Sequence, residues 1–216
     1  MEKLDRNFRG ILNTYKPVGP SSFAMIKKLR NVLTEKKIGH AGTLDPLASG
    51  VLVVAVGREF TKKIEKIQKL KKAYVASLRL GEFSTTDDGE GDKERVIFKK
   101  ESSIKEVERC LQANTGRRMQ TPPKYSAKKI AGQRAYKLAR AGRDFTLEPK
   151  EITIYEINTI EYKFPNLKVE VICSSGTYIR SLAREIGSCL KTGAYLKSLE
   201  RTAVGNYKME DAIKLK

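Results

Sequence analysis

Residues 39–52 (GHAGTLDPLASGVL) contain the side chains best suited to chemistry: Asp45, directly before a proline, and His40, the single histidine of the chain. An Asp-Pro step is common in turns, where the carboxylate bonds nearby backbone N–H groups. Two features favour a reactive carboxylate instead. The glycines allow backbone and substrate to approach closely, and the apolar run that follows predicts a rigid strand to hold the motif. Asp45 is the candidate catalytic residue, with a structural turn as the alternative.

A reactive carboxylate that stays ionised needs a cation close by. Arg180, in SSGTYIRSLARE, is the candidate, because a guanidinium binds a carboxylate in a bidentate fork and keeps its charge. A solvated helix arginine is the alternative. Tyr74 and Tyr178 could each offer a flat surface to a base taken out of its stack, or simply pack in the core. His40 could contact a phosphate or a base, or serve as a structural hydrogen-bonding group.

Other kinds of site find little support in the sequence. It contains no P-loop, no HExxH and no GxGxxG motif. Cys110, Cys173 and Cys189 are scattered, which is typical of a reduced cytosolic chain rather than of a zinc site or a disulfide framework. We therefore expect no metal and no cofactor.

Charge points to the class of partner. Lysine and arginine total 43 against 25 acidic residues, a formal net charge of +18. Such an excess favours a polyanion such as nucleic acid, with a merely basic soluble protein as the alternative. The N-terminus lacks an apolar signal core, and no stretch approaches the ~20 apolar residues of a membrane span. We expect a soluble, cytoplasmic protein that does not act at a membrane.

Alternating and 3.6-residue apolar patterns predict the elements that must position these side chains. The predicted strands are 10–17, 51–56, 71–81, 151–163, 167–174 and 194–207. One predicted helix begins at Ser21 or Ser22 and carries Phe23, Ile26, Leu29 and Leu33 on one face; a second begins with a Ser103/Glu106 capping box; a third carries Ile179, Leu182, Ile186 and Leu190 and ends at Gly193. Residues 82–94 read as a loop, and the basic, proline-broken segment 117–150 as an arm outside the core. The mixture predicts an α+β domain around a mixed sheet.

Seven ordered stretches carry a family resemblance. They are NTYKPVGPSS (13–22), KKIGHAGTLDPLASGVLVVAVG (36–57), KKAYVASLRLG (71–81), STTDDGEG (84–91), QTPPKYSAKKIAGQRAYKLARAG (120–142), SSGTYIRSLARE (174–185) and GAYLKSLERTAVG (193–205). Along nearly all of its length the chain resembles the bacterial tRNA pseudouridine-55 synthases. The resemblance implies the pseudouridine synthase fold, a mixed, mostly antiparallel sheet flanked by helices, with residues 117–150 as a thumb-like insertion that grips the T-arm of tRNA.

The resemblance also implies roles for particular residues. Asp45 becomes the catalytic aspartate that isomerises a flipped uridine, and Arg180 pairs with its carboxylate. Tyr74 stacks on the base, Tyr178 and the backbone around Leu199 line the uracil pocket, His40 helps to displace or hold the extruded nucleotide, and Lys16 lies near the active site. Positive charge on the arm, at Lys128, Lys129 and Arg134, binds RNA.

Some features depart from the family pattern. Glu200 stands where a second basic residue is usual, Lys191 where glycine is common, and Ser21 where threonine is frequent. Residues 1–216 are predicted to be one catalytic domain, and the C-terminal RNA-binding domain usual in the family is absent from this chain. We expect a monomer with no obligate protein partner. Two alternatives are a guide-RNA-dependent pseudouridine synthase and a non-catalytic protein that binds or folds tRNA.

Overall fold

The computed structural model describes residues 5–215, which form two compact units. Unit 1 combines the described residues up to Val75 with those from Leu199 onward, and unit 2 comprises Ala76–Ser198. Strands β4 (Lys72–Leu80) and β12 (Ala194–Val204) pass from one unit into the other. The boundary between the two units therefore falls within these two strands, and no stretch of linker-like composition marks it in the sequence. The predicted α+β class, with mixed and mostly antiparallel strand pairing, is confirmed.

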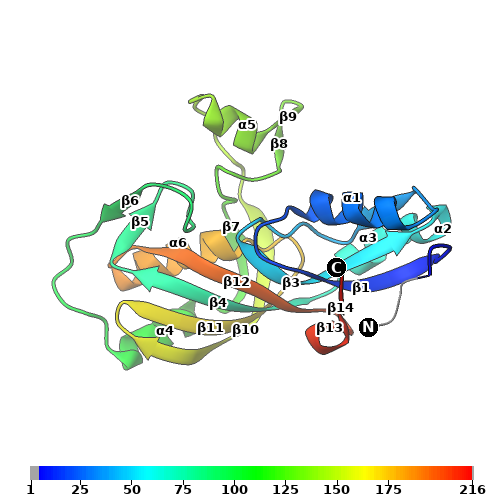
Figure 1. The fold of residues 1–216 in the computed structure, drawn as a ribbon. Coiled ribbons are helices and arrows are strands. Elements are labelled where there is room, and N and C mark those ends of the chain that lie inside the picture. Colours follow the sequence, from blue (N-terminus) through cyan, green and yellow to red (C-terminus); the bar gives the residue numbers. More distant parts are fainter. Residues whose placement is uncertain (1–4, 216) are drawn as a thin grey trace. The chain divides into compact units, whose positions relative to one another are not determined.

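Unit 1 is built around the long strand β3 (Ala48–Val56), which pairs with three other strands. β1 (Gly10–Lys16) and β2 (Ile38–His40) run antiparallel to it, and residues 199–201 of β12 run parallel to it. The remaining elements of the unit are α1 (Ser22–Val32), α2 (Arg58–Thr61), α3 (Ile64–Gln68), β13 (Tyr207–Lys208), η1 (Met209–Asp211) and β14 (Ile213–Lys214) (Figure 1). The Asp45 segment thus leads directly into a buried strand, as the sequence predicts.

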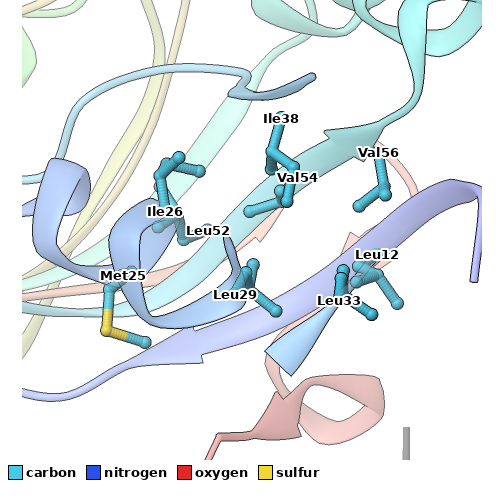
Figure 2. Packing of buried hydrophobic residues seen from close by; sticks show 9 residues of the cluster. All are labelled: Leu12, Met25, Ile26, Leu29, Leu33, Ile38, Leu52, Val54 and Val56. Atoms are coloured by element: carbon cyan, nitrogen blue, oxygen red, sulfur yellow. The ribbon is translucent and has the colours of Figure 1, made fainter. Parts of the chain in front are cut away.

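One buried apolar cluster of unit 1 lies between α1 and the strands β1, β2 and β3 (Figure 2), and a second contains Val51 and Val53 of β3. Helix α1 begins because the Ser21 hydroxyl accepts a hydrogen bond from the N–H of Ala24. The prediction that Phe23 shares a face with Ile26, Leu29 and Leu33 is wrong: Phe23 is 64% exposed, whereas Met25 is buried. The buried face of the helix has Ser22, Met25, Ile26 and Leu29 at the spacing i, i+3, i+4 and i+7, and Phe23 lies outside it.

Unit 2 contains a second run of neighbouring strands, in the order β4, β11, β10 and β7. The bounds of the other elements are β5 (Glu82–Ser84), β6 (Lys93–Arg95), α4 (Ile104–Ala113), β7 (Gly116–Gln120), β10 (Lys150–Lys163), β11 (Asn166–Cys173) and α6 (Ile179–Leu190). The predicted capping box is confirmed: the Ser103 hydroxyl accepts from the Glu106 N–H, and the Glu106 carboxylate accepts from the Ser103 N–H. The predicted loop at 82–94 instead contains most of the β5–β6 hairpin.

The basic arm is shorter than the sequence suggests. Residues 116–120 pair with residues 150–154 as strands β7 and β10, so the inserted segment begins only after Gln120. It carries β8 (Lys129–Ile130), β9 (Gln133–Arg134) and α5 (Ala135–Arg140), which stand away from strands β10 and β11 of the same unit (Figure 1). Between residues 5 and 215, none of the helices has the length and apolar character needed to span a membrane.

The contact between β3 and β12 predicts the effect of a substitution at Gly50. This residue has φ +106°, and a Cβ added there would lie 2.2 Å from the carbonyl oxygen of Arg201. We expect Gly50→Ala to lower the free energy of unfolding by roughly 3 kcal/mol, because the clash is with backbone and cannot relax by a rotamer change. Urea denaturation measures this loss.

Gly116→Ala is the matched control. Gly116 has φ +100° but no heavy atom within 4 Å of its added Cβ. Gly116→Ala should therefore lower the free energy of unfolding only by the cost of the backbone strain, about 1 kcal/mol. Equal losses in the two variants would contradict a steric role for Gly50.

Candidate active site

Asp45 occupies the first position of a hydrogen-bonded turn. The N–H of Ala48 donates to the Asp45 carbonyl at 3.0 Å, and Pro46 takes the second position, which proline favours. The side chain is half-buried. The turn and the candidate catalytic role are compatible, because the hydrogen bond that closes the turn uses the backbone carbonyl of Asp45 and not its carboxylate.

Two residues from the stretch 13–22 anchor this turn. The Ser22 hydroxyl donates to the Leu44 carbonyl at 2.9 Å and accepts from the Leu44 N–H at 2.8 Å. The N–H of Gly19 donates to the Pro46 carbonyl at 2.9 Å. Ser22 is 1% exposed, so both of its bonds are made away from water. The residues on either side of Asp45 are therefore held by direct hydrogen bonds.

Lys16 is a buried cation in the same region. Its ammonium donates to the carbonyls of Pro17 at 2.8 Å and Pro20 at 2.9 Å. Burial lowers the pKa of Lys16 from 10.5 to about 8; the carboxylate of Asp45 opposes this shift and the charge of Arg201 adds to it. Lys16 and Asp45 are thus close enough to interact electrostatically, and the role of Lys16 in the site stays a prediction.

His40 and Leu199 also lie in unit 1, on strands that pair with β3. His40 is opposite Val54, and Leu199 is opposite Ala48, three residues after Asp45. Burial, followed by the charge of Arg201, lowers the pKa of His40 below its usual value. Unit 1 therefore places Lys16, His40 and Leu199 on or next to the strands that pair with β3, and their roles in the site stay predictions.

Tyr74 and Glu200 are two further residues of unit 1 that stand out in the sequence. Tyr74 lies on β4 and is 7% exposed, on the face that its alternating strand pattern predicts. Its stacking role stays a prediction. The carboxylate of Glu200 accepts weak hydrogen bonds from the hydroxyls of Tyr15 at 3.4 Å and Ser49 at 3.3 Å. Glu200, which departs from the family pattern, thus has polar partners among the described residues.

Arg180 lies in the first turn of α6 in unit 2 and has an acidic partner that the sequence analysis missed. Its Nη1 lies 3.3 Å from Oδ2 of Asp88, and both side chains are more than nine-tenths buried. Nη2 donates to the Tyr125 carbonyl at 3.1 Å. Asp88 lies in the quoted STTDDGEG stretch, and its two adjacent aspartates were the available signal. The predicted pairing of Arg180 with Asp45 stays a prediction.

The neighbouring aspartate makes a parallel contact. Asp87 forms an ion pair with Arg184, one helical turn after Arg180. Burial raises the pKa of the Asp87 carboxyl, although Arg184 and Arg180 oppose this shift. The loop 84–91 therefore supplies two carboxylates to two successive turns of α6.

The remaining predicted residues of unit 2 lie at the start of α6 and on the arm. Tyr178 precedes α6, and its backbone is held by Gln120, whose side chain accepts from the Tyr178 N–H at 2.8 Å and donates to its carbonyl at 3.2 Å. Lys129 and Arg134 are exposed, and the ammonium of Lys128 donates to the Glu148 carbonyl. The RNA-binding role of these three cations stays a prediction. Throughout residues 5–215, no group of three or more histidine, cysteine, aspartate or glutamate side chains is arranged to hold a metal ion.

The lowered pKa of Lys16 predicts a pH dependence of stability. Between about pH 8 and 10.5 the unfolded chain binds the Lys16 proton while the folded chain has released it, so this residue makes stability rise with pH in that window. Over the whole window, the lowered pKa of Lys16 changes the free energy of unfolding by ~3 kcal/mol. In urea denaturation across this range, the free energy of unfolding of Lys16→Met should fall relative to that of wild type as pH rises. A constant difference between the two proteins would contradict the shift.

Comparison with known proteins agrees with the predicted family. The family model described as "TruB family pseudouridylate synthase (N terminal domain)" matches residues 30–179. A protein of Clostridium novyi named tRNA pseudouridine synthase B is 45% identical over 206 residues, which are 95% of this chain and 71% of the relative. The protein of the same name from Phocaeicola vulgatus is 43% identical over 92% of this chain and 86% of the relative.

A solved structure supports the fold as well. The chain matches one in the "Crystal Structure of a Cbf5-Nop10-Gar1 Complex" with a TM-score of 0.74 and 28% identity, over 95% of this chain. It spans about half, 52%, of the length of that solved chain. With the family model covering more than half of its residues and curated relatives above 40% identity, this chain, which has the pseudouridine synthase fold, belongs to the TruB family of pseudouridylate synthases.

Proposed function

We propose that this protein isomerises uridine to pseudouridine in tRNA, at position 55 in the T-arm. The observation that carries the proposal is the anchored turn that presents the Asp45 carboxylate, in a chain of the TruB family. The names of the curated relatives, tRNA pseudouridine synthase B, support the choice of tRNA as substrate. The net charge of +18 suits a polyanionic substrate. Such a role places the protein in the cytoplasm, where it acts as a single chain.

The proposed reaction changes bonds without changing composition. The bond between N1 of uracil and C1′ of the ribose breaks, and a bond between C5 and C1′ forms. The proton on C5 passes to water, and N1 gains a proton, so the product is an isomer of the substrate. The target base must leave its stack to expose these atoms. Asp45 adds to the base or the sugar, or removes a proton, and each of these steps requires the ionised carboxylate.

The other residues hold the substrate and the carboxylate. In this proposal Arg180 is the cation that keeps Asp45 ionised, because a carboxylate taken out of water without a cation tends to protonate. Tyr74 stacks on the flipped base, Tyr178 and the backbone at Leu199 line the uracil pocket, and His40 and Lys16 contact the extruded nucleotide or its surroundings. Lys128, Lys129 and Arg134 on the arm bind phosphates of the T-arm.

Two other functions are weighed against this proposal. Guide-RNA-dependent modification is the first alternative. The matching chain in the Cbf5-Nop10-Gar1 complex is 28% identical to this one, against 45% for the Clostridium novyi protein named tRNA pseudouridine synthase B, which favours the proposed function. A non-catalytic tRNA-binding protein would need the basic surface alone. Burying Lys16 near Asp45, and Arg180 against Asp88, costs free energy. A protein that only binds tRNA would have no need of these buried charges.

The direct test uses a tRNA transcript tritiated at C5 of uracil. Wild type, with no guide RNA and no other protein, should release tritium, and Asp45→Asn should release it at least ~1000-fold more slowly, because the amide cannot replace an ionised carboxylate. Both proteins should bind tRNA alike. Release that depends on a guide RNA would favour the second function, and a wild type that folds and binds tRNA without release would favour the third.

The buried ion pair of Arg180 predicts a second kinetic effect. Asp88→Asn should lower the single-turnover rate at least ~10-fold while tRNA affinity stays within about twofold, because Asp88 orients Arg180 rather than touching phosphate. The change is measured by rapid quench with excess enzyme.

Asp87→Asn is the matched control for this substitution. It removes the neighbouring carboxylate in the same loop, whose partner is Arg184 instead of Arg180. We expect its single-turnover rate to stay near that of wild type. Equal rate losses in the two variants would mean that the loop acts only through its fold.

A further inference from the structure

Arg201, on β12, is a buried guanidinium whose described partners are both carbonyl oxygens. It is 1% exposed. Nε donates to the Val51 carbonyl at 2.7 Å, and Nη2 donates to the Gly42 carbonyl at 3.1 Å. Across residues 5–215 it forms no salt bridge with a carboxylate. Because a buried charge without a counter-ion is costly, its presence in the core calls for a specific role.

The two carbonyls lie at the two ends of the segment that carries Asp45. Gly42 comes three residues before Asp45, and Val51 comes six residues after it, in β3. One planar guanidinium therefore bridges the beginning and the end of residues 42–51. Arginine suits this task because its donors have a fixed fork geometry, which a lysine ammonium does not provide.

The backbone of Arg201 is itself fixed against the same segment. Arg201 is opposite Gly50 in the parallel pairing of β12 with β3. Since a Cβ at Gly50 would meet the Arg201 backbone at 2.2 Å, only glycine permits this approach. Both the main chain and the side chain of Arg201 thus contact residues 42–51.

The charge of Arg201 also reaches the other candidate site residues in unit 1. After burial, it contributes to the lowered pKa of His40, and it contributes to the lowered pKa of Lys16, which Asp45 opposes. Lys16 therefore interacts with both Asp45 and Arg201. This electrostatic link places the guanidinium among the site residues rather than in a remote part of the core.

We propose that Arg201 is a positioning residue for the isomerisation: by bridging the carbonyls of Gly42 and Val51, it fixes the segment that presents the Asp45 carboxylate. The inference rests on the proposed function, since it concerns the rate of that reaction. It assigns Arg201 no contact with substrate. A residue that only stabilised the fold would change the amount of folded protein but not the rate of each folded molecule.

Arg201→Lys is the main test, because it retains the positive charge but lacks the planar fork whose Nε and Nη2 reach the two carbonyls. We expect the folded variant to bind tRNA within about twofold of wild type and to react at least ~30-fold more slowly in single-turnover tritium release. Arg30→Lys is the matched control. Arg30 lies in the same unit and donates to the Ile38 carbonyl, outside the Asp45 segment, so its rate should equal that of wild type.

The single histidine gives an independent readout of the charge. NMR titration of His40 should show the same pKa in Arg201→Lys as in wild type, and a higher pKa in Arg201→Gln, because a nearby cation opposes protonation of the imidazole. A merely structural role does not require this pattern. An unchanged His40 pKa in a folded Arg201→Gln would remove the electrostatic link to the site.

Three outcomes would overturn the inference. The first is a folded Arg201→Lys that reacts at the wild-type rate. The second is an equal rate loss in Arg30→Lys. The third is loss of folding in both Arg201→Lys and Arg201→Gln, which would make Arg201 a requirement of the fold rather than of the reaction. Absence of tritium release by wild type itself is a different result, which refutes the proposed function and this inference with it.

Discussion

The geometry of the candidate site depends on the two hydrogen bonds between the Ser22 hydroxyl and the backbone of Leu44. They join the first residue of α1 to the residue directly before Asp45. Because Ser22 is buried, losing its hydroxyl would leave a buried donor and a buried acceptor of Leu44 unsatisfied, which costs more than the bonds themselves contribute. The same face of α1 buries Met25, Ile26 and Leu29, so the packing of the helix and these hydrogen bonds favour one orientation.

Buried charge is the second constraint on the structure. Unit 1 buries Lys16 and Arg201, and unit 2 buries Arg180 with Asp88. Well-packed apolar side chains at such positions are often as stable or more so, so stability alone does not account for these residues. In unit 1 their hydrogen bonds go to the backbone carbonyls of Pro17, Pro20, Gly42 and Val51. In that unit we interpret the cost of burial as the consequence of holding the segment of the proposed catalytic residue Asp45 in one geometry.

Local sequence signals predicted much of this chain correctly, for identifiable reasons. The alternation of Tyr74, Ala76, Leu78 and Leu80 specifies one face of a strand, and the Ser103/Glu106 capping box starts α4 by contacts three residues apart. Lys191, which stands where glycine is common in the family, takes φ +57° at the end of α6, the conformation that glycine favours there. Asp45, His40, Lys16 and Leu199 could be predicted as site residues from the sequence because they lie in short, distinctive motifs.

The sequence by itself determined the family and most of the longer strands and helices, because hydrophobic periodicity, caps and motifs are local. Only the tertiary structure decided which polar groups are buried and what they contact. The pairing of Arg180 with Asp88 joins residues 92 positions apart, and that of Arg201 with Val51 joins residues 150 apart. No local pattern encodes such contacts. They arise because β12 lies beside β3, and because the loop after β5 folds against the first turns of α6, where burial makes each unpaired charge costly.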